Sequence, residues 1–144
     1  MRRWRPQDGL GWLLLAFGLI SLGNAVWMLA APLHWYQELP AHVPDFGPFN
    51  PHFVRDIGCA FATVGVALAW AALAPRRRFA LAAVGTLFYV AHAAVHVFDT
   101  LRHAVEPVHL WIDFPGVYLP AIVLLVAAVI ARRREGGEHA SRTD

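Results

Sequence analysis

"LGWLLLAFGLISLGNAVWMLAA", residues 10–31, is an apolar run without a single charged side chain. A helix needs about 20 residues to cross the roughly 30 Å of hydrocarbon in a bilayer, and this run has that length. Three further apolar runs follow, at about residues 53–74, 79–98 and 114–131. A soluble four-helix bundle would carry a polar stripe on every helix, and these runs do not. The sequence therefore predicts an all-α fold, a bundle of four transmembrane helices.

The composition supports one membrane domain. Of 144 residues, 58% are hydrophobic, which is more than a soluble domain of this size needs. We expect residues 1–131 to form the membrane domain and residues 132–144 to form a polar, disordered tail. The first run follows a basic start, but it is longer than a typical secretory signal core, so we expect it to remain as a helix. The single cysteine, Cys59, excludes an internal disulfide and a multi-cysteine zinc site.

The arginines predict the orientation in the membrane. The chain has no lysine, and all but Arg55 and Arg102 of its arginines fall on one side of the predicted helices. By the positive-inside rule, both termini and the short "PRRR" loop at residues 75–78 face the cytoplasm. We therefore expect a multi-pass protein of the bacterial inner membrane, whose partner is the lipid bilayer. The anchoring of the arginines at this membrane explains the basic charge of the chain. A nucleic-acid partner is not needed to explain it.

The first loop, "PLHWYQELPAHVPDFGPFNPH" at residues 32–52, contains half of the prolines of the chain. Proline and glycine disfavour helix here. The aromatic side chains of the loop suit the membrane–water interface. We therefore expect this loop to lie as a lid over the outer end of the bundle.

Small residues predict how two of the helices pack. Gly58, Ala62, Gly65 and Ala69 fall within a sector of about 60° on the second helix at 100° per residue. Such a small-residue face lets transmembrane backbones approach closely. Gly11 and Gly18 of the first helix are expected to do the same.

The stretch "HAAVHVFDTLRH", residues 92–103, carries polar groups at intervals of four, three and four residues. His92, His96, Asp99 and His103 share one stripe roughly 60° wide, provided that the helix continues past Phe98. A second stripe, on the second helix, contains His52, Asp56, Cys59 and Thr63. Because polar groups in a membrane are costly and often functional, we expect the two stripes to meet at the outer end of the bundle.

Histidines four residues apart can chelate one metal from a single helix face, and carboxylates can supply further ligands. The sequence thus predicts a transition-metal site for copper, zinc or iron, and its candidate ligands are His52, Asp56, His92, His96, Asp99 and His103. A haem is less well supported, since axial ligands must come from opposite faces of the ring. The protein would then handle metal or serve as a small subunit of a membrane redox enzyme.

Two other functions stay open. The same groups could recognise a polar ligand or carry protons in a membrane binding or transport protein, or they could only fix helix packing in an assembly subunit. The loop histidines His34, His42 and His109 are expected to be solvated side chains without a role. Whether the protein is an enzyme is not decided by any of these patterns.

The motif "GPFNPHFVRDIGCAF", residues 47–61, resembles the small bacterial DoxX-like membrane proteins. The resemblance covers the layout of four helices with a long first outer loop and a polar motif that opens the second helix. It implies a four-helix membrane fold and a possible link to redox pathways. The small size and the small-residue faces further suggest a homo-oligomer or a larger membrane complex.

Overall fold

The computed structural model describes residues 5–140, with side chains described as far as residue 137. Its four long helices are α1 (Gly9–Ala30), α3 (Pro51–Leu73), α4 (Arg78–Leu101) and α6 (Leu119–Ala140). Four stretches, Gly9–Ala30, Pro51–Leu73, Pro75–Leu101 and Phe114–Gly137, are long and apolar enough to cross a membrane. The predicted fold is confirmed: the chain is an all-α, multi-pass membrane protein with four candidate spans.

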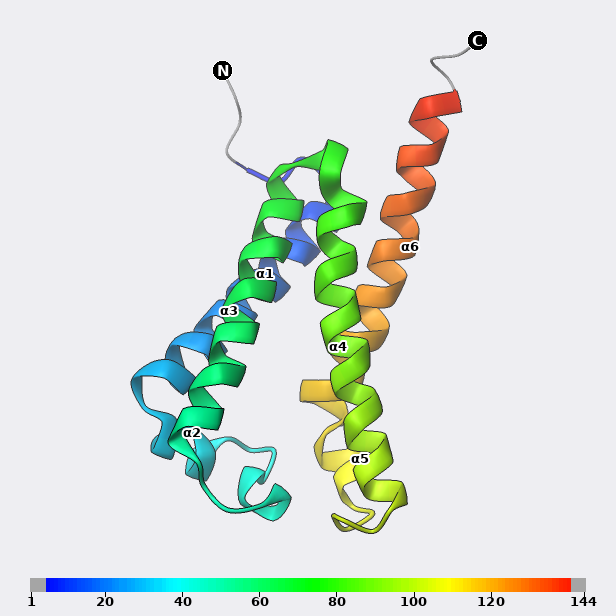
Figure 1. Ribbon diagram of the computed structural model, residues 1–144. Helices are drawn as coiled ribbons and strands as arrows, with labels where there is room; N and C mark the ends of the chain where they lie inside the picture. The colour runs from blue at the N-terminus through cyan, green and yellow to red at the C-terminus, as the bar shows by residue number, and fades with distance from the viewer. Residues whose placement is uncertain (1–4, 141–144) are drawn as a thin grey trace.

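The helices form two side-by-side pairs. α1 packs along α3 and α4 packs along α6, while α3 and α4 connect the pairs (Figure 1). α1 begins and α6 ends at the same end of the bundle, together with the turn η2 (Pro75–Arg77) (Figure 1). We call this the arginine-rich end. The opposite end, formed by residues 31–50 and 102–113, is called the histidine end.

Glycine faces set the distance between α1 and α3. A Cβ added at Gly18 would lie 2.8 Å from the backbone nitrogen of Ala69 and 2.9 Å from the carbonyl oxygen of Gly65. A Cβ at Gly65 would in turn meet Leu22 and the carbonyl oxygen of Gly18. The predicted close approach through small residues is therefore confirmed.

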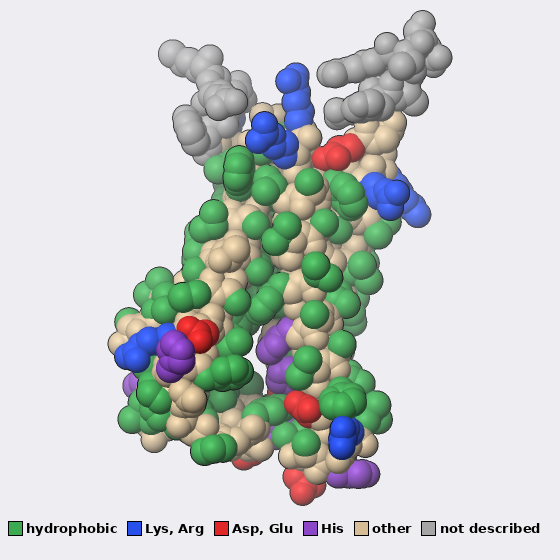
Figure 2. All heavy atoms as spheres, in the orientation of Figure 1, with side chains coloured by type: hydrophobic (Ala, Val, Ile, Leu, Met, Phe, Trp, Pro, Cys, Tyr) green, Lys and Arg blue, Asp and Glu red, His purple; other side chains and the backbone are tan. Residues whose placement is uncertain are grey.

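The four helices share a core only in the half near the arginine-rich end. Leu14 of α1, Leu68 of α3 and Leu124 of α6 are completely enclosed there. Near the edge of this core, the hydroxyls of Ser21 and Tyr89 lie 2.9 Å apart and link α1 to α4. Toward the histidine end the two pairs separate, and Figure 2 shows histidine side chains in the hollow between them. The structure thus combines an apolar core at one end with polar side chains at the other.

The predicted loop at residues 32–52 is partly helical. It contains α2 (Pro32–Glu38) and the 3₁₀ turn η1 (Val43–Phe46). The expectation that its prolines disfavour helix was wrong for α2, because Pro32 stands at the first helical position, where the missing N–H has no intrahelical partner in any case. The third loop likewise contains a short helix, α5 (His109–Ile112), followed by a π-helical turn, η3 (Phe114–Tyr118).

Two helix ends also differ from the prediction. α6 continues to Ala140, so the part of the expected disordered tail that the structure describes is helical; residues 141–144 lie outside the described residues. α4 ends at Leu101, and His103 adopts a left-handed conformation with φ 56°. The N–H of His103 donates to the carbonyl oxygen of Thr100 and that of Ala104 to Asp99, which is a Schellman motif.

Candidate functional site

The buried carboxylate of Asp113 is the centre of the histidine end. Its side chain is fully enclosed, with 0% exposure. Its Oδ2 lies 2.8 Å from Nδ1 of His96, which comes from α4. Its Oδ1 lies 3.7 Å from Nδ1 of His109, one turn earlier on α5. Asp113 therefore stands between two imidazoles that come from different parts of the chain.

The first loop covers this centre. Oδ2 of Asp45, in η1, lies 3.1 Å from Nε2 of His109. The ring of the neighbouring Phe46 packs against both imidazoles, with its centroid 4.9 Å from that of His96 and 4.8 Å from that of His109. The predicted role of this loop as a lid over one end of the bundle is confirmed by these contacts.

His92 lies one turn deeper in the bundle than His96. The two imidazole centroids are 4.6 Å apart, with the rings edge to face. The other neighbours of His92 are aromatic: its ring stacks on Phe88 and meets Phe61 of α3 edge-on. His92 thus extends the polar network from the histidine end toward the apolar core.

Three buried polar atoms near this centre have no hydrogen-bond partner among the described residues. They are Nδ1 of His109, Oδ1 of Asp113 and Oη of Tyr118. A buried polar atom without a partner costs about 1–3 kcal/mol, so such groups mark places where a proton or a small polar molecule would be accepted.

We name the set Asp45, His96, His109 and Asp113 the Asp–His network.

The predicted convergence of two polar stripes is not found. His52 and Asp56 form a pair with 3.4 Å between Nε2 and Oδ2, but their side chains are 87% and 60% exposed. Cys59 and Thr63 of the same stripe are exposed as well. The reason is the glycine face of α3: because it packs against α1, the polar face of α3 turns away from the bundle interior.

The second predicted stripe is divided by the end of α4. His92 and His96 point to the interior of the bundle, and Asp99 is half-buried. His103 is exposed and lies beyond the helix, so it does not share their face. α4 does continue past Phe98, but it ends at Leu101, two residues before His103, so the stripe holds only for His92, His96 and Asp99.

Across residues 5–137, no group of three or more histidine, cysteine, aspartate or glutamate side chains is placed to hold a metal ion. Of the six predicted ligands, the structure brings His92 and His96 together and pairs His52 with Asp56 at a separate place. The two pairs come from different faces of different helices.

Sequence reasoning missed three members of the Asp–His network. His109 was expected to be solvated, yet it is 1% exposed. The spacing of His109 and Asp113, four residues apart, could have indicated a shared helical face. The contact of Asp45 with His109 joins residues 64 apart in the chain, and no local pattern predicts it.

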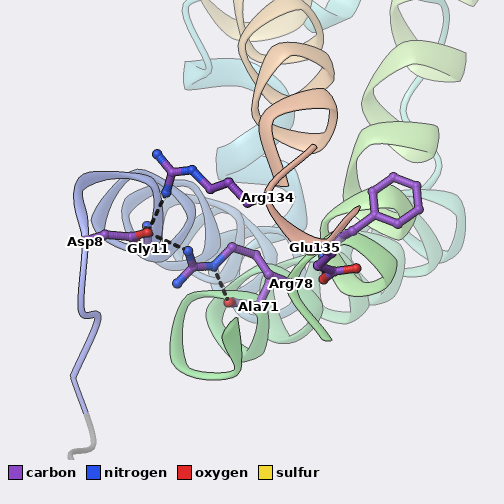
Figure 3. A network of polar contacts seen from close by, with 7 residues as sticks. Asp8, Gly11, Ala71, Arg78, Arg134 and Glu135 are labelled. Atoms are coloured by element: carbon purple, nitrogen blue, oxygen red, sulfur yellow. Dashed lines mark hydrogen bonds and ion pairs between the residues drawn. The ribbon is translucent and has the colours of Figure 1, made fainter. Parts of the chain in front are cut away.

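A second polar network, at the arginine-rich end, was also missed (Figure 3). Asp8 caps α1 by accepting from the N–H of Gly11. Its Oδ2 accepts from Nη1 of Arg78 at 2.8 Å and from Nη1 of Arg134 at 2.7 Å. Nε of Arg78 donates to the carbonyl oxygen of Ala71 at the end of α3. The network therefore joins all four long helices.

The environment of Asp8 favours its ionised form. Burial raises the pKa of this carboxyl, but the N–H of Gly11 and the guanidiniums of Arg78 and Arg134 outweigh burial and lower the pKa below its ordinary value of 3.8. Close by, Oε1 of Glu135 accepts from the backbone N–H of Phe79 and so caps the start of α4. The molecule thus has one polar network at the histidine end and another at the arginine-rich end.

The chain belongs to a family whose function is unknown. The model of that family, DUF6632, matches residues 11–143. No curated protein and no solved structure matches the chain. The family match does not show a link to the DoxX-like proteins, so that resemblance stays a prediction.

Proposed function

We propose that the protein handles protons in the membrane and that the Asp–His network is its proton-accepting site, facing the outside of the cell. The single observation that carries this proposal is the alternation of carboxylates and imidazoles in contact: Asp45, His109, Asp113 and His96. Each neighbour in this series is a titratable group of the other kind. Two of the three contacts are hydrogen bonds, and the third, between His109 and Asp113, has a separation of 3.7 Å.

The burial of Asp113 supports a bound proton. An ionised carboxylate without water costs several kcal/mol unless an opposite charge lies beside it. The groups beside it are the imidazoles of His96 and His109. A proton on either imidazole, or on the carboxylate itself, removes the unpaired charge. The burial of this carboxylate between two imidazoles therefore supports a proton-accepting role.

The network also has a path to water. Asp45 is exposed and lies on the lid, while its carboxylate contacts the enclosed His109. A proton that binds Asp45 from solvent can pass to Nε2 of a neutral His109. The imidazolium that forms keeps its Nδ1 proton, 3.7 Å from Oδ1 of Asp113, and leaves Asp45 ionised again. The exposed carboxylate thus connects solvent to the buried pair.

A transition-metal function at His92 and His96 is the second candidate. Its support is the 4.6 Å separation of the two imidazole rings. The contact of Nδ1 of His96 with Asp113 is a further point in its favour, because carboxylates often orient metal-binding histidines in this way. The protein would then handle metal or support a redox enzyme.

Histidine protonation tests the first candidate. Protein with ¹⁵N-labelled histidine is placed in lipid nanodiscs and its imidazole signals are followed from pH 8 to pH 4. We expect the signals of His96 and His109 to change together in the wild type and independently in Asp113→Asn. Asp56→Asn, which removes the exposed carboxylate beside His52, is the matched control and should alter the titration of His52 alone.

Unchanged titration of His96 and His109 in Asp113→Asn would exclude a shared proton. Elemental analysis of the same sample, purified without chelator, separates the two candidates. About one metal ion per chain that is lost when His92 and His96 are replaced by alanine would favour the metal function.

A further inference from the structure

The arginine-rich end contains a pocket of about 600 Å³. It lies between the start of α1, the turn η2 and the end of α6. Its lining includes Asp8, Arg78, Arg134 and Glu135 (Figure 3). This pocket is at the other end of the molecule from the Asp–His network and does not rest on the function proposed for that network.

The two guanidiniums of this pocket are both directed to one of its two carboxylates. Arg78 and Arg134 both donate to one oxygen of Asp8, so two guanidiniums share one carboxylate. Arg78 is 5% exposed, and its Nη2 is buried with no hydrogen-bond partner in the part of the chain that the structure describes. Glu135 is directed to the backbone N–H of Phe79 and forms no ion pair with a described guanidinium.

Four further arginines stand close to the pocket in the sequence. Arg76 and Arg77 form part of η2, and Arg132 and Arg133 precede Arg134 on α6. Arg134 itself is 54% exposed and uses one nitrogen for Asp8, and its other N–H groups have no hydrogen-bond partner among the side chains of residues 5–137. A guanidinium is planar and matches the oxygens of a phosphate group in pairs of hydrogen bonds.

We propose that this pocket binds a phosphate group, either from the headgroup of an anionic lipid or as inorganic phosphate. Arg134 would be the direct ligand, and the enclosed Arg78 would supply fixed positive charge behind it. Basic pockets between transmembrane helices on the cytoplasmic side are typical places for anionic headgroups. The predicted orientation puts this end at the inner leaflet.

Native mass spectrometry of delipidated protein in a neutral detergent tests the proposal. The probes are phosphatidylglycerol, inorganic phosphate and phosphatidylcholine, whose choline neutralises the headgroup. Arg134→Gln should weaken binding of the anionic probe, phosphatidylglycerol or inorganic phosphate, about tenfold, as expected for a charge-assisted hydrogen bond. The matched control is Arg133→Gln, one residue earlier on α6, which should weaken it about twofold or less through diffuse charge alone.

Asp8→Asn provides a change of opposite sign. Asparagine retains an oxygen for the cap of α1, but it removes the internal anion that competes for the two arginines. Binding of the probe should therefore tighten in this variant. A purely structural role of the arginines would not produce tighter binding.

The probes distinguish the source of the phosphate. Binding of phosphatidylglycerol but not of inorganic phosphate assigns the pocket to a lipid, and binding of inorganic phosphate that displaces phosphatidylglycerol assigns it to the free ion. The proposal is overturned if neither probe binds better than phosphatidylcholine. It is also overturned if Arg134→Gln and Arg133→Gln weaken binding equally, or if Asp8→Asn fails to tighten it.

Discussion

Asp113 is the residue on which the histidine end depends. Replacing it with asparagine leaves the size of the side chain nearly unchanged but removes the charge that His96 and His109 face. Because breaking a buried pair leaves its partner uncompensated, we expect Asp113→Asn to lower the free energy of unfolding by about 3 kcal/mol. Asp56→Asn, at an exposed pair, should change it by less than about 0.5 kcal/mol. Thermal and denaturant unfolding in detergent measure both, and equal effects would contradict the account.

His103 is a helix-ending residue in this structure, whereas the sequence suggested a metal ligand. It holds a left-handed conformation, φ 56°, that a glycine adopts without strain. We therefore expect His103→Gly to raise the free energy of unfolding by about 0.5–1 kcal/mol. Thermal unfolding provides the measurement. A ligand role would instead show as loss of bound metal, and destabilisation would contradict the assignment of His103 to the Schellman motif.

Asp8 makes the stability of the protein depend on pH in acid. Its folded-state pKa is lowered, so its contribution is present above the unfolded value of 3.8 and is lost as the pH falls through the lower folded value. Since the carboxylate is 35% exposed, we expect Asp8→Asn to cost only about 0.5–1 kcal/mol at pH 7 after solvent screening.

The difference between wild type and Asp8→Asn should shrink below pH 3.8 and vanish once the pH lies below the lowered folded-state pKa. Melting temperatures of both proteins, taken at steps from pH 7 to pH 2, provide the check. A difference that stays constant, or that grows toward acid, would show that Asp8 does not act through its charge.

At the scale of the helices, the α1–α3 contact decides which side chains face the interior. A methyl group at Gly18 would meet the backbone of α3, which cannot move aside easily. We expect Gly18→Ala to destabilise the protein by about 1–3 kcal/mol. Gly23 lies on the same helix with nothing within 4 Å of an added Cβ, so Gly23→Ala should be neutral or stabilising by up to about 1 kcal/mol. Denaturant unfolding of the two variants tests this, and equal losses would exclude a glycine-dependent contact.

The elements themselves were predictable because length and hydropathy are local properties of the chain. The four apolar runs predicted the four helices, and the small-residue face of residues 58–69 predicted a close approach of helix backbones, which the structure places between α1 and α3. The direction in which His52 and Asp56 point was not predictable in the same way. It depends on which helix the glycine face meets, and the angular spacing of polar residues on one helix carries no information about its neighbour.

The candidate site was predictable only in part for a related reason. His92 and His96 stand out because their spacing of four residues puts them on one helix face. The partner of His96 is Asp113, from the start of the fourth span, and the partner of His109 is Asp45, from the lid. Those contacts depend on how two irregular segments fold over the bundle end, and irregular segments have no periodicity to read.

At the scale of the whole molecule, polar chemistry is separated along the bundle axis. Most arginine side chains lie at one end, and histidine and acidic side chains lie mainly at the other, together with two arginines, Arg55 and Arg102 (Figure 2). The proposed proton-accepting site requires the histidine end to face the outside, and the proposed phosphate pocket suits the inner leaflet. Both proposals therefore depend on the same orientation, which the positive-inside rule predicts.

Labelling of single cysteines with a membrane-impermeant maleimide is the most direct test of that orientation. Cys59 is first replaced by alanine, and one cysteine is introduced either at Glu106, exposed at the histidine end, or at Gly136, exposed near the end of α6. We predict that Glu106→Cys reacts in intact cells and that Gly136→Cys reacts only after the membrane is permeabilised. The reverse pattern, with Gly136→Cys reacting in intact cells and Glu106→Cys protected, would contradict the account.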